Sequence, residues 1–97
     1  MPNTPRDSTL MLEVGRRLAA TRKALDLTQA QLAEQLGITR TRLGNWEVGR
    51  GLPDVDTMMR LNRRHSISLD WVYRGDLSNL PHHLAKRLLR DLQVEQI

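Results

Sequence analysis

The strongest constraint on the fold lies in residues 28–49, where the pattern predicts two short helices separated by only three residues. Thr28 can cap the first helix, because its hydroxyl accepts from a backbone N–H while Gln31 reaches back to the N–H of the cap residue. Apolar residues then recur at helical spacing, namely Leu32, Ala33 and Leu36. Gly37 ends the helix, since glycine adopts the left-handed conformation without a Cβ penalty. Two helices joined this tightly are held across one another.

The second helix of the pair starts after Thr39, which is placed to act as its N-cap. Leu43 and Trp46 share one face of this helix, so that face is predicted to point inward. The other face carries hydrogen-bond donors and short polar groups, namely Arg40, Thr41, Arg42 and Asn45. Side chains of this kind suit the base edges and phosphates of a nucleic acid.

Composition favours a small domain with a polyanionic partner. Ninety-seven residues with 39% apolar content fit one domain with a single core and leave no length for a second, ligand-binding domain, so no small-molecule ligand is inferred. The net charge of +4 favours a polyanion. The sequence has no apolar run of membrane-spanning length and no signal-peptide pattern, so we expect a cytoplasmic protein without membrane contact.

No pattern of catalytic or metal-binding residues is found in the sequence. The absence of cysteine excludes disulfides and thiolate metal sites. The histidines are His65, His82 and His83, and we expect all three to be solvated surface residues, since the adjacent pair has no acidic cluster at ligand spacing. Nucleophile-elbow and phosphate-loop motifs are absent. The sequence therefore predicts no enzyme activity, no metal ion and no cofactor.

Hydrophobic spacing and cap residues predict an all-α chain without strands. Beside the pair above, helices are expected over residues 8–25, 54–65 and 68–75. Asp54 and Ser68 are the expected caps of the last two. The residues of the fourth helix that are expected to reach the core are Val55, Met58, Met59 and Leu61.

Residues 77–97 contain a further amphipathic helix. On a helical wheel that starts at Pro81, the apolar residues Leu84, Ala85, Leu88, Leu89 and Leu92 form a stripe about 140° wide. A helix of about four turns is marginal alone in water, so we expect the stripe to be buried. Either the helix packs back on its own domain, or it pairs with the same helix of a second subunit.

A longer series of residues matches a known family in order and spacing. The series consists of Arg22, Leu27, Thr28, Gln29, Leu32, Ala33, Gly37, Trp46, Glu47, Gly49, Pro53, Ser68, Leu69, Asp70, Trp71 and Gly75. By this series the chain resembles, over about residues 15–75, the helix-turn-helix domains of the phage lambda and 434 repressors and their Cro proteins, the Xre family. The resemblance implies a five-helix, lambda-repressor-like DNA-binding domain, to which the tail helix is an addition.

The resemblance also implies roles for polar residues around the second helix of the pair. The residues that match base-facing positions of the family are Thr39, Arg40, Thr41 and Asn45. The residues that match phosphate-contacting positions are Gln29, Arg42 and Arg50. The family pairs Glu47 with an arginine at the position of Arg22, and Trp46 is expected in the core. Gly44 lies on the outward side, where it either lets DNA approach closely or is a tolerated weakness of the helix.

Together these observations predict a flexible arm over residues 1–7, a DNA-binding domain over residues 8–76 and a helical extension over residues 77–97, one candidate for a dimer contact. The resemblance implies a sequence-specific transcriptional regulator that places about residues 40–48 in the major groove of double-stranded DNA and binds an inverted repeat as a homodimer. Two alternatives stay open. One is an antitoxin-like or other protein-interaction module that uses the tail helix, and the other is a coactivator of this fold that binds DNA without sequence preference.

Overall fold

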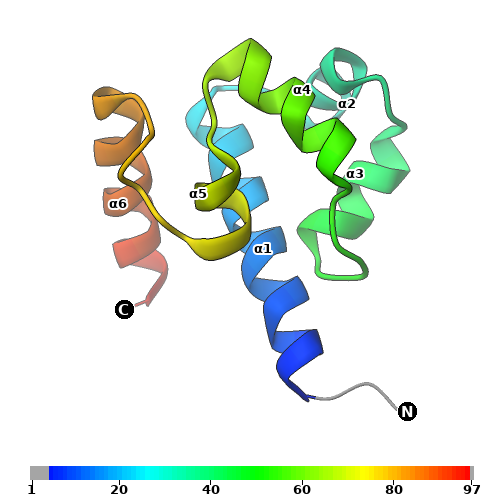
Figure 1. Cartoon of the computed structure of the whole chain (residues 1–97), viewed down its shortest axis with the longest axis horizontal. Helices are drawn as coiled ribbons and strands as arrows, with labels where there is room; N and C mark the ends of the chain where they lie inside the picture. The colour runs from blue at the N-terminus through cyan, green and yellow to red at the C-terminus, as the bar shows by residue number, and fades with distance from the viewer. Residues whose placement is uncertain (1–4, 97) are drawn as a thin grey trace.

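The computed structural model of the chain describes residues 5–96, and within them it shows six α-helices and no strand (Figure 1). The helices are α1 (Pro5–Ala24), α2 (Gln29–Leu36), α3 (Arg40–Glu47), α4 (Val55–His65), α5 (Leu69–Arg74) and α6 (His82–Gln96). α3 packs on one side of α1 and α6 on the other (Figure 1). The all-α class, the five-helix domain and the additional C-terminal helix are confirmed. Each helix within residues 5–96 is too short or too polar to cross a membrane.

The first helix begins earlier than the sequence predicted. α1 starts at Pro5 rather than at Ser8, so residues 5–7 of the expected arm are helical. Proline suits the first turn of a helix, because its φ is already helical and its missing N–H has no intrahelical partner there. Residues 1–4 of the expected arm lie outside the described residues.

The predicted cap residues set the helix ends. The capping box at the start of α2 is present: Gln31 N donates to Thr28 Oγ1 at 3.1 Å, and Thr28 N donates to Gln31 Oε1 at 2.9 Å. Gly37 follows α2 with a φ of 71°, in the left-handed region. The remaining caps also lie where the sequence placed them, at Thr39, Asp54, Ser68 and Gly75.

The core lies between α1 and the helices around it. Side chains that are fully or almost fully buried include Val14, Leu18, Leu32, Leu36, Leu43, Trp46, Met58, Leu61, Trp71 and Val72. The expectation that Val55 and Met59 reach this core is wrong, since they are 58% and 36% exposed. They stand four residues apart and share a face of α4 that points away from Leu61.

The backbones of α1 and α3 come into direct contact at Gly15. A Cβ at this position would lie 2.8 Å from the Glu47 carbonyl oxygen and closer still to that of Trp46. The backbone of α1 therefore touches the C-terminal end of α3 directly, and no side chain fits between them. This contact fixes the distance between the first helix and the third.

α6 packs on its own domain, against α1. Pairing of α6 with the same helix of a second subunit stays a prediction. The leucines of its stripe that are buried are Leu84 and Leu88. Arg87 adds a polar attachment, because its Nη1 donates to the Ala24 carbonyl oxygen at the end of α1 at 2.9 Å and its Nη2 to Asp26 at 3.0 Å. Leu89 is left 48% exposed.

Candidate nucleic-acid interface

The residues that the sequence assigns to base contacts lie on α3, most of them at its N-terminal end. Arg40 and Thr41 are exposed, and within the described part of the chain neither has a hydrogen-bond or ion-pair partner. Thr39 is exposed too, and its hydroxyl oxygen caps the helix by accepting from the Arg42 N–H at 3.0 Å. Asn45 is half-buried and lies about one turn further along. This end of α3 therefore offers free polar groups to a partner.

Asn45 is joined to Arg50, the loop residue that the sequence assigns to a phosphate. The Arg50 N–H donates to the Asn45 carbonyl oxygen at 2.9 Å, and Arg50 Nη1 donates to Asn45 Oδ1 at 3.4 Å. Gly49 lies between them with a φ of 83°, which turns the chain back over the end of α3. No local pattern indicates this pair, because neighbours along a helix stand three or four residues apart and Arg50 lies beyond the helix end.

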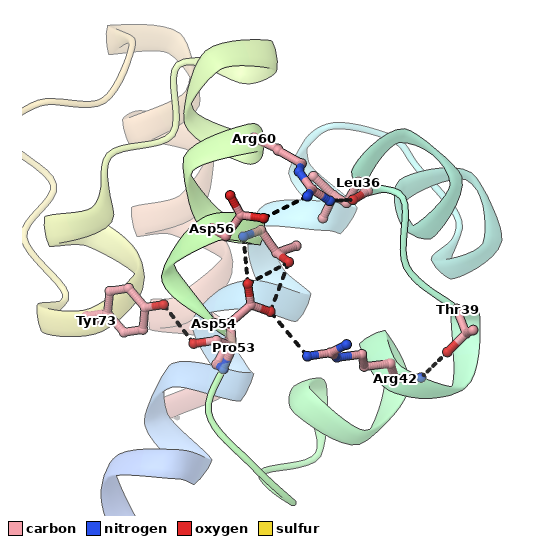
Figure 2. A network of polar contacts seen from close by, with 9 residues as sticks. Leu36, Thr39, Arg42, Pro53, Asp54, Asp56, Arg60 and Tyr73 are labelled. Atoms are coloured by element: carbon pink, nitrogen blue, oxygen red, sulfur yellow. Dashed lines mark hydrogen bonds and ion pairs between the residues drawn. The ribbon is translucent and has the colours of Figure 1, made fainter.

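Arg42, a predicted phosphate contact, is held against the protein. Its guanidinium lies 5.1 Å from the centre of the Trp46 ring, as in a cation–π contact. It also donates to Asp54 at 3.4 Å (Figure 2). The Arg42 side chain is 57% exposed, so its guanidinium keeps donors for a further anion.

Asp54 combines this ion pair with the N-cap of α4. Its carboxylate accepts from the Thr57 N–H at 2.8 Å and from the Thr57 hydroxyl at 2.9 Å. The backbone hydrogen bond from Thr57 is the main cause that holds the pKa of Asp54 below its usual value, and the Arg42 charge adds to it. One carboxylate thus connects the start of α4 to α3.

The ion pair between Arg22 and Glu47 forms as the family resemblance implies, and a third residue joins it. Arg22 Nε and Nη2 donate to the two Glu47 carboxylate oxygens at 2.8 and 3.2 Å. Gln29 Nε2 donates to Glu47 Oε1 at 2.9 Å. One amide N–H of Gln29 is therefore used inside the protein, and the other is left for the phosphate that the sequence predicts. The three side chains tie α1, α2 and α3 together.

Gly44 faces this cluster. A Cβ at Gly44 would lie 3.7 Å from Gln29 Nε2, which is an ordinary van der Waals distance. Its neighbour is thus the first residue of α2, and the fold itself does not require glycine at this position.

Arg60 is a structural residue beside the two helices that the sequence did not single out. Its Nη1 donates to the Leu36 carbonyl oxygen at the C-terminal end of α2 at 2.8 Å, and its Nη2 donates to Asp56 at 2.6 Å (Figure 2). A cation at a helix C-terminus is favourable, because the last carbonyl groups carry partial negative charge. The spacing of four residues between Asp56 and Arg60 signals their ion pair, but nothing local signals the contact with α2.

His65 departs from its expected place on the solvated surface. It is half-buried, and its Nε2 lies 2.7 Å from Gln35 Oε1. Burial is the main cause that lowers the pKa of His65. His82 and His83 are exposed, as expected. Among residues 5–96 no three side chains of metal-binding type come together.

Comparisons with known proteins agree with this geometry. A family model described as helix-turn-helix matches residues 18–72, more than half of the chain. The cryptic phage CTXphi transcriptional repressor RstR of Vibrio cholerae is 37% identical over 85 residues, which cover 88% of this chain and 76% of that protein.

Two further relatives are longer than this chain. The HTH-type transcriptional activator BcrR of Enterococcus faecalis is 34% identical over 65 residues, 67% of this chain and 32% of BcrR. Repressor protein C2 of Salmonella phage P22 is 31% identical over 72 residues, 72% of this chain and 33% of C2. The chain thus matches about a third of the length of these two relatives. Family membership also agrees with the prediction that the chain is not an enzyme. On the match over residues 18–72 and the paired helices α2 and α3, the chain belongs to the Xre family of helix-turn-helix, DNA-binding regulators.

Proposed function

We propose that this chain regulates transcription by binding an inverted-repeat operator as a homodimer, with α3 of each subunit in the major groove. The two half-sites would lie one helical turn apart, about 34 Å. In this arrangement the base-facing residues are Thr39, Arg40, Thr41 and Asn45, and the phosphate-contacting residues are Gln29, Arg42 and Arg50.

The observation that carries the proposal is the contrast between the two faces of α3. The inward face is fixed by Trp46, by the ion pair of Glu47 with Arg22 and by the backbone contact at Gly15. The outward face exposes Arg40, which has no partner in the described part of the chain. A rigidly held helix with a free guanidinium suits base recognition, because the helix can enter the groove without reorganising.

Repression is the mode of regulation that we propose. The match with RstR covers a larger share of this chain and of the relative than the match with BcrR does. RstR is named a repressor, whereas BcrR is named an activator. A protein that occupies an operator represses by excluding other proteins from the same DNA. The cytoplasm, where bacterial promoters are transcribed, is the location we expect.

Selection of bound duplexes from a random DNA pool tests the proposal. We expect an enriched palindromic consensus with half-site centres one helical turn apart. Sedimentation of the protein with the selected duplex should show two chains on each operator. If the bound duplexes show no enriched sequence, the protein binds DNA without sequence preference, as the coactivator alternative requires.

Substitutions then separate base contacts from phosphate contacts. Arg40→Ala should weaken binding to the selected duplex by about 1 to 3 kcal/mol and affect a scrambled duplex less, because only the operator offers the base. Arg42→Ala should lower the affinity for the selected and the scrambled duplex by the same factor. It should also reduce the slope of the logarithm of the binding constant against the logarithm of the salt concentration, by about 0.9 for each lost phosphate contact. Gln29→Ala should also lower the affinity for both duplexes by the same factor. The slope of the salt dependence should change little, because glutamine is neutral. Arg63→Ala is a matched control, since Arg63 is an exposed arginine in the last turn of α4, and this end of the helix lies away from α3 (Figure 1).

A further inference from the structure

Two of the hydrogen-bond acceptors on the outward side of α3 already accept hydrogen bonds within the protein. Thr39 Oγ1 accepts from the Arg42 N–H at 3.0 Å. Asn45 Oδ1 accepts from Arg50 Nη1 at 3.4 Å. The carboxylate of Glu47 belongs to the inward face, where its ion pair with Arg22 leaves it only 4% exposed. These contacts leave few acceptors on this side for a ligand.

Donors remain on the same surface. Arg40 has a complete guanidinium with five N–H groups, and no partner for it exists within the described residues. Asn45 keeps the two N–H groups of its amide, and Arg50 keeps the N–H groups that do not face Asn45. Thr41 is exposed and its hydroxyl can either donate or accept. The side chains of this surface therefore mainly donate.

The bases differ in what they offer to such a surface. In the major groove guanine presents two adjacent acceptors, N7 and O6. Adenine presents an acceptor beside a donor, N7 and N6–H₂, and cytosine presents only a donor. An asparagine recognises adenine by donating to N7 and accepting from N6, so it needs a free Oδ1.

Building on the proposed function, we propose that the half-sites carry guanine where α3 reads them. Arg40 donates to N7 and O6 of one guanine in each half-site. Arg50 is a positioning residue: it donates to Asn45 Oδ1 and so competes with the N6–H₂ group of adenine for that oxygen. The Arg50 N–H bond to the Asn45 carbonyl oxygen, 2.9 Å long, holds the loop in the position that this requires.

The first test uses the selected duplex with 7-deazaguanine in place of each consensus guanine in turn, which removes the N7 acceptor and keeps base pairing. At one guanine per half-site, we expect the wild-type protein to lose affinity on the order of 10- to 100-fold. Arg40→Ala should lose affinity for the unmodified duplex by a similar factor and be insensitive to the deaza substitution at that base. A consensus without guanine, or guanines that tolerate the substitution, would overturn the inference while leaving sequence-specific binding intact. A pool without any consensus would overturn the proposed function as well.

The second test repeats the selection with Arg50→Ala. Release of Asn45 Oδ1 should bring adenine into one position of each half-site where the wild-type protein does not select it. The double variant Arg50→Ala with Asn45→Ala should lose that adenine again. Arg63→Ala, which also removes one positive charge, should select the wild-type consensus. If Arg50→Ala binds more weakly but selects an unchanged consensus, Arg50 contacts only phosphate and its positioning role is wrong.

Discussion

Gly15 of α1 lies directly against the carbonyl oxygen of Trp46 in α3, with no room for a side chain between the two helices. The Trp46 ring is buried beside this contact, and the next residue, Glu47, is paired with Arg22 of α1. Backbone contact, ring burial and ion pair all act on the same end of α3. The orientation of α3, the helix that we propose enters the major groove, is therefore set mainly at its C-terminal end, while Arg40 and Thr41 at its N-terminal end stay exposed.

Gly15→Ala should destabilise the protein although alanine is the better helix former. A methyl group here meets two backbone carbonyl oxygens, which cannot rotate away, and overpacking of this kind costs about 1 to 3 kcal/mol. Urea unfolding followed by circular dichroism measures the loss, and DNA affinity should also fall because α3 shifts. A variant as stable as the wild type would show that the contact between α1 and α3 can widen without cost.

Gly44→Ala should have the opposite effect. The added methyl group would stand at an ordinary distance from Gln29, so the gain in helix propensity, about 1 kcal/mol, should appear as added stability. We expect DNA affinity to stay unchanged, because the methyl group would fit beside Gln29 without displacing it. A variant that is more stable but binds DNA more weakly would instead show that DNA approaches the backbone at Gly44.

Glu47→Gln should cost about 3 kcal/mol of stability, since removal of one partner leaves the Arg22 charge in a site that is largely shielded from water. Adding Arg22→Gln should restore part of the loss, because the unpaired charge is then gone. Thermal or urea unfolding of the two single variants and the double variant gives the coupling free energy. Additive losses would mean that the ion pair contributes little beyond its two separate side chains.

Asp54 should contribute stability that depends on pH. Its pKa is lower in the folded protein than its ordinary value of 3.8, so its contribution is present above that value and is lost as the pH falls through the folded pKa. Asp54→Asn keeps an N-cap and should cost less than Asp54→Ala, which should lose about 1 kcal/mol. The difference in the free energy of unfolding between the wild type and Asp54→Asn should shrink as the pH is lowered from about 6 to about 3. Urea unfolding at a series of pH values measures it. A difference that is constant over this range would exclude the carboxylate charge as its source.

The helix ends and the path of the chain could be predicted from the sequence because their signals are local. Thr28 with Gln31, Gly37 and Thr39 each act within four residues of their own position, and the structure shows all of them in the expected geometry. The Arg22–Glu47 pair was also predicted, but by resemblance to a family. Spacing alone does not connect residues 25 positions apart.

The contacts that the sequence did not reveal depend on how helices meet. Gly15 looks like a weak point of a helix until α3 is seen against it, and Arg87 looks like one more charge on a polar face until the end of α1 is seen beside it. Val55 has the chemistry of a core residue but lies on the wrong side of α4. Each case needs the relative placement of two helices, which propensity and periodicity do not supply.

Substitutions of Leu88 and Leu89 should distinguish the two roles that the sequence left open for α6, packing on its own domain and pairing with a second subunit. Leu88 is fully buried, so Leu88→Ala should cost about 2 to 5 kcal/mol by the lost burial and the cavity left behind. Leu89 is 48% exposed, and Leu89→Ala should change stability by less than about 0.5 kcal/mol. We expect Leu89→Ala also to leave the sedimentation coefficient unchanged, because one exposed leucine is far less than the roughly 800 Å² per partner of a stable interface. A dimer that dissociates on Leu89→Ala, with the subunit fold intact, would show instead that α6 pairs with its copy in a second subunit.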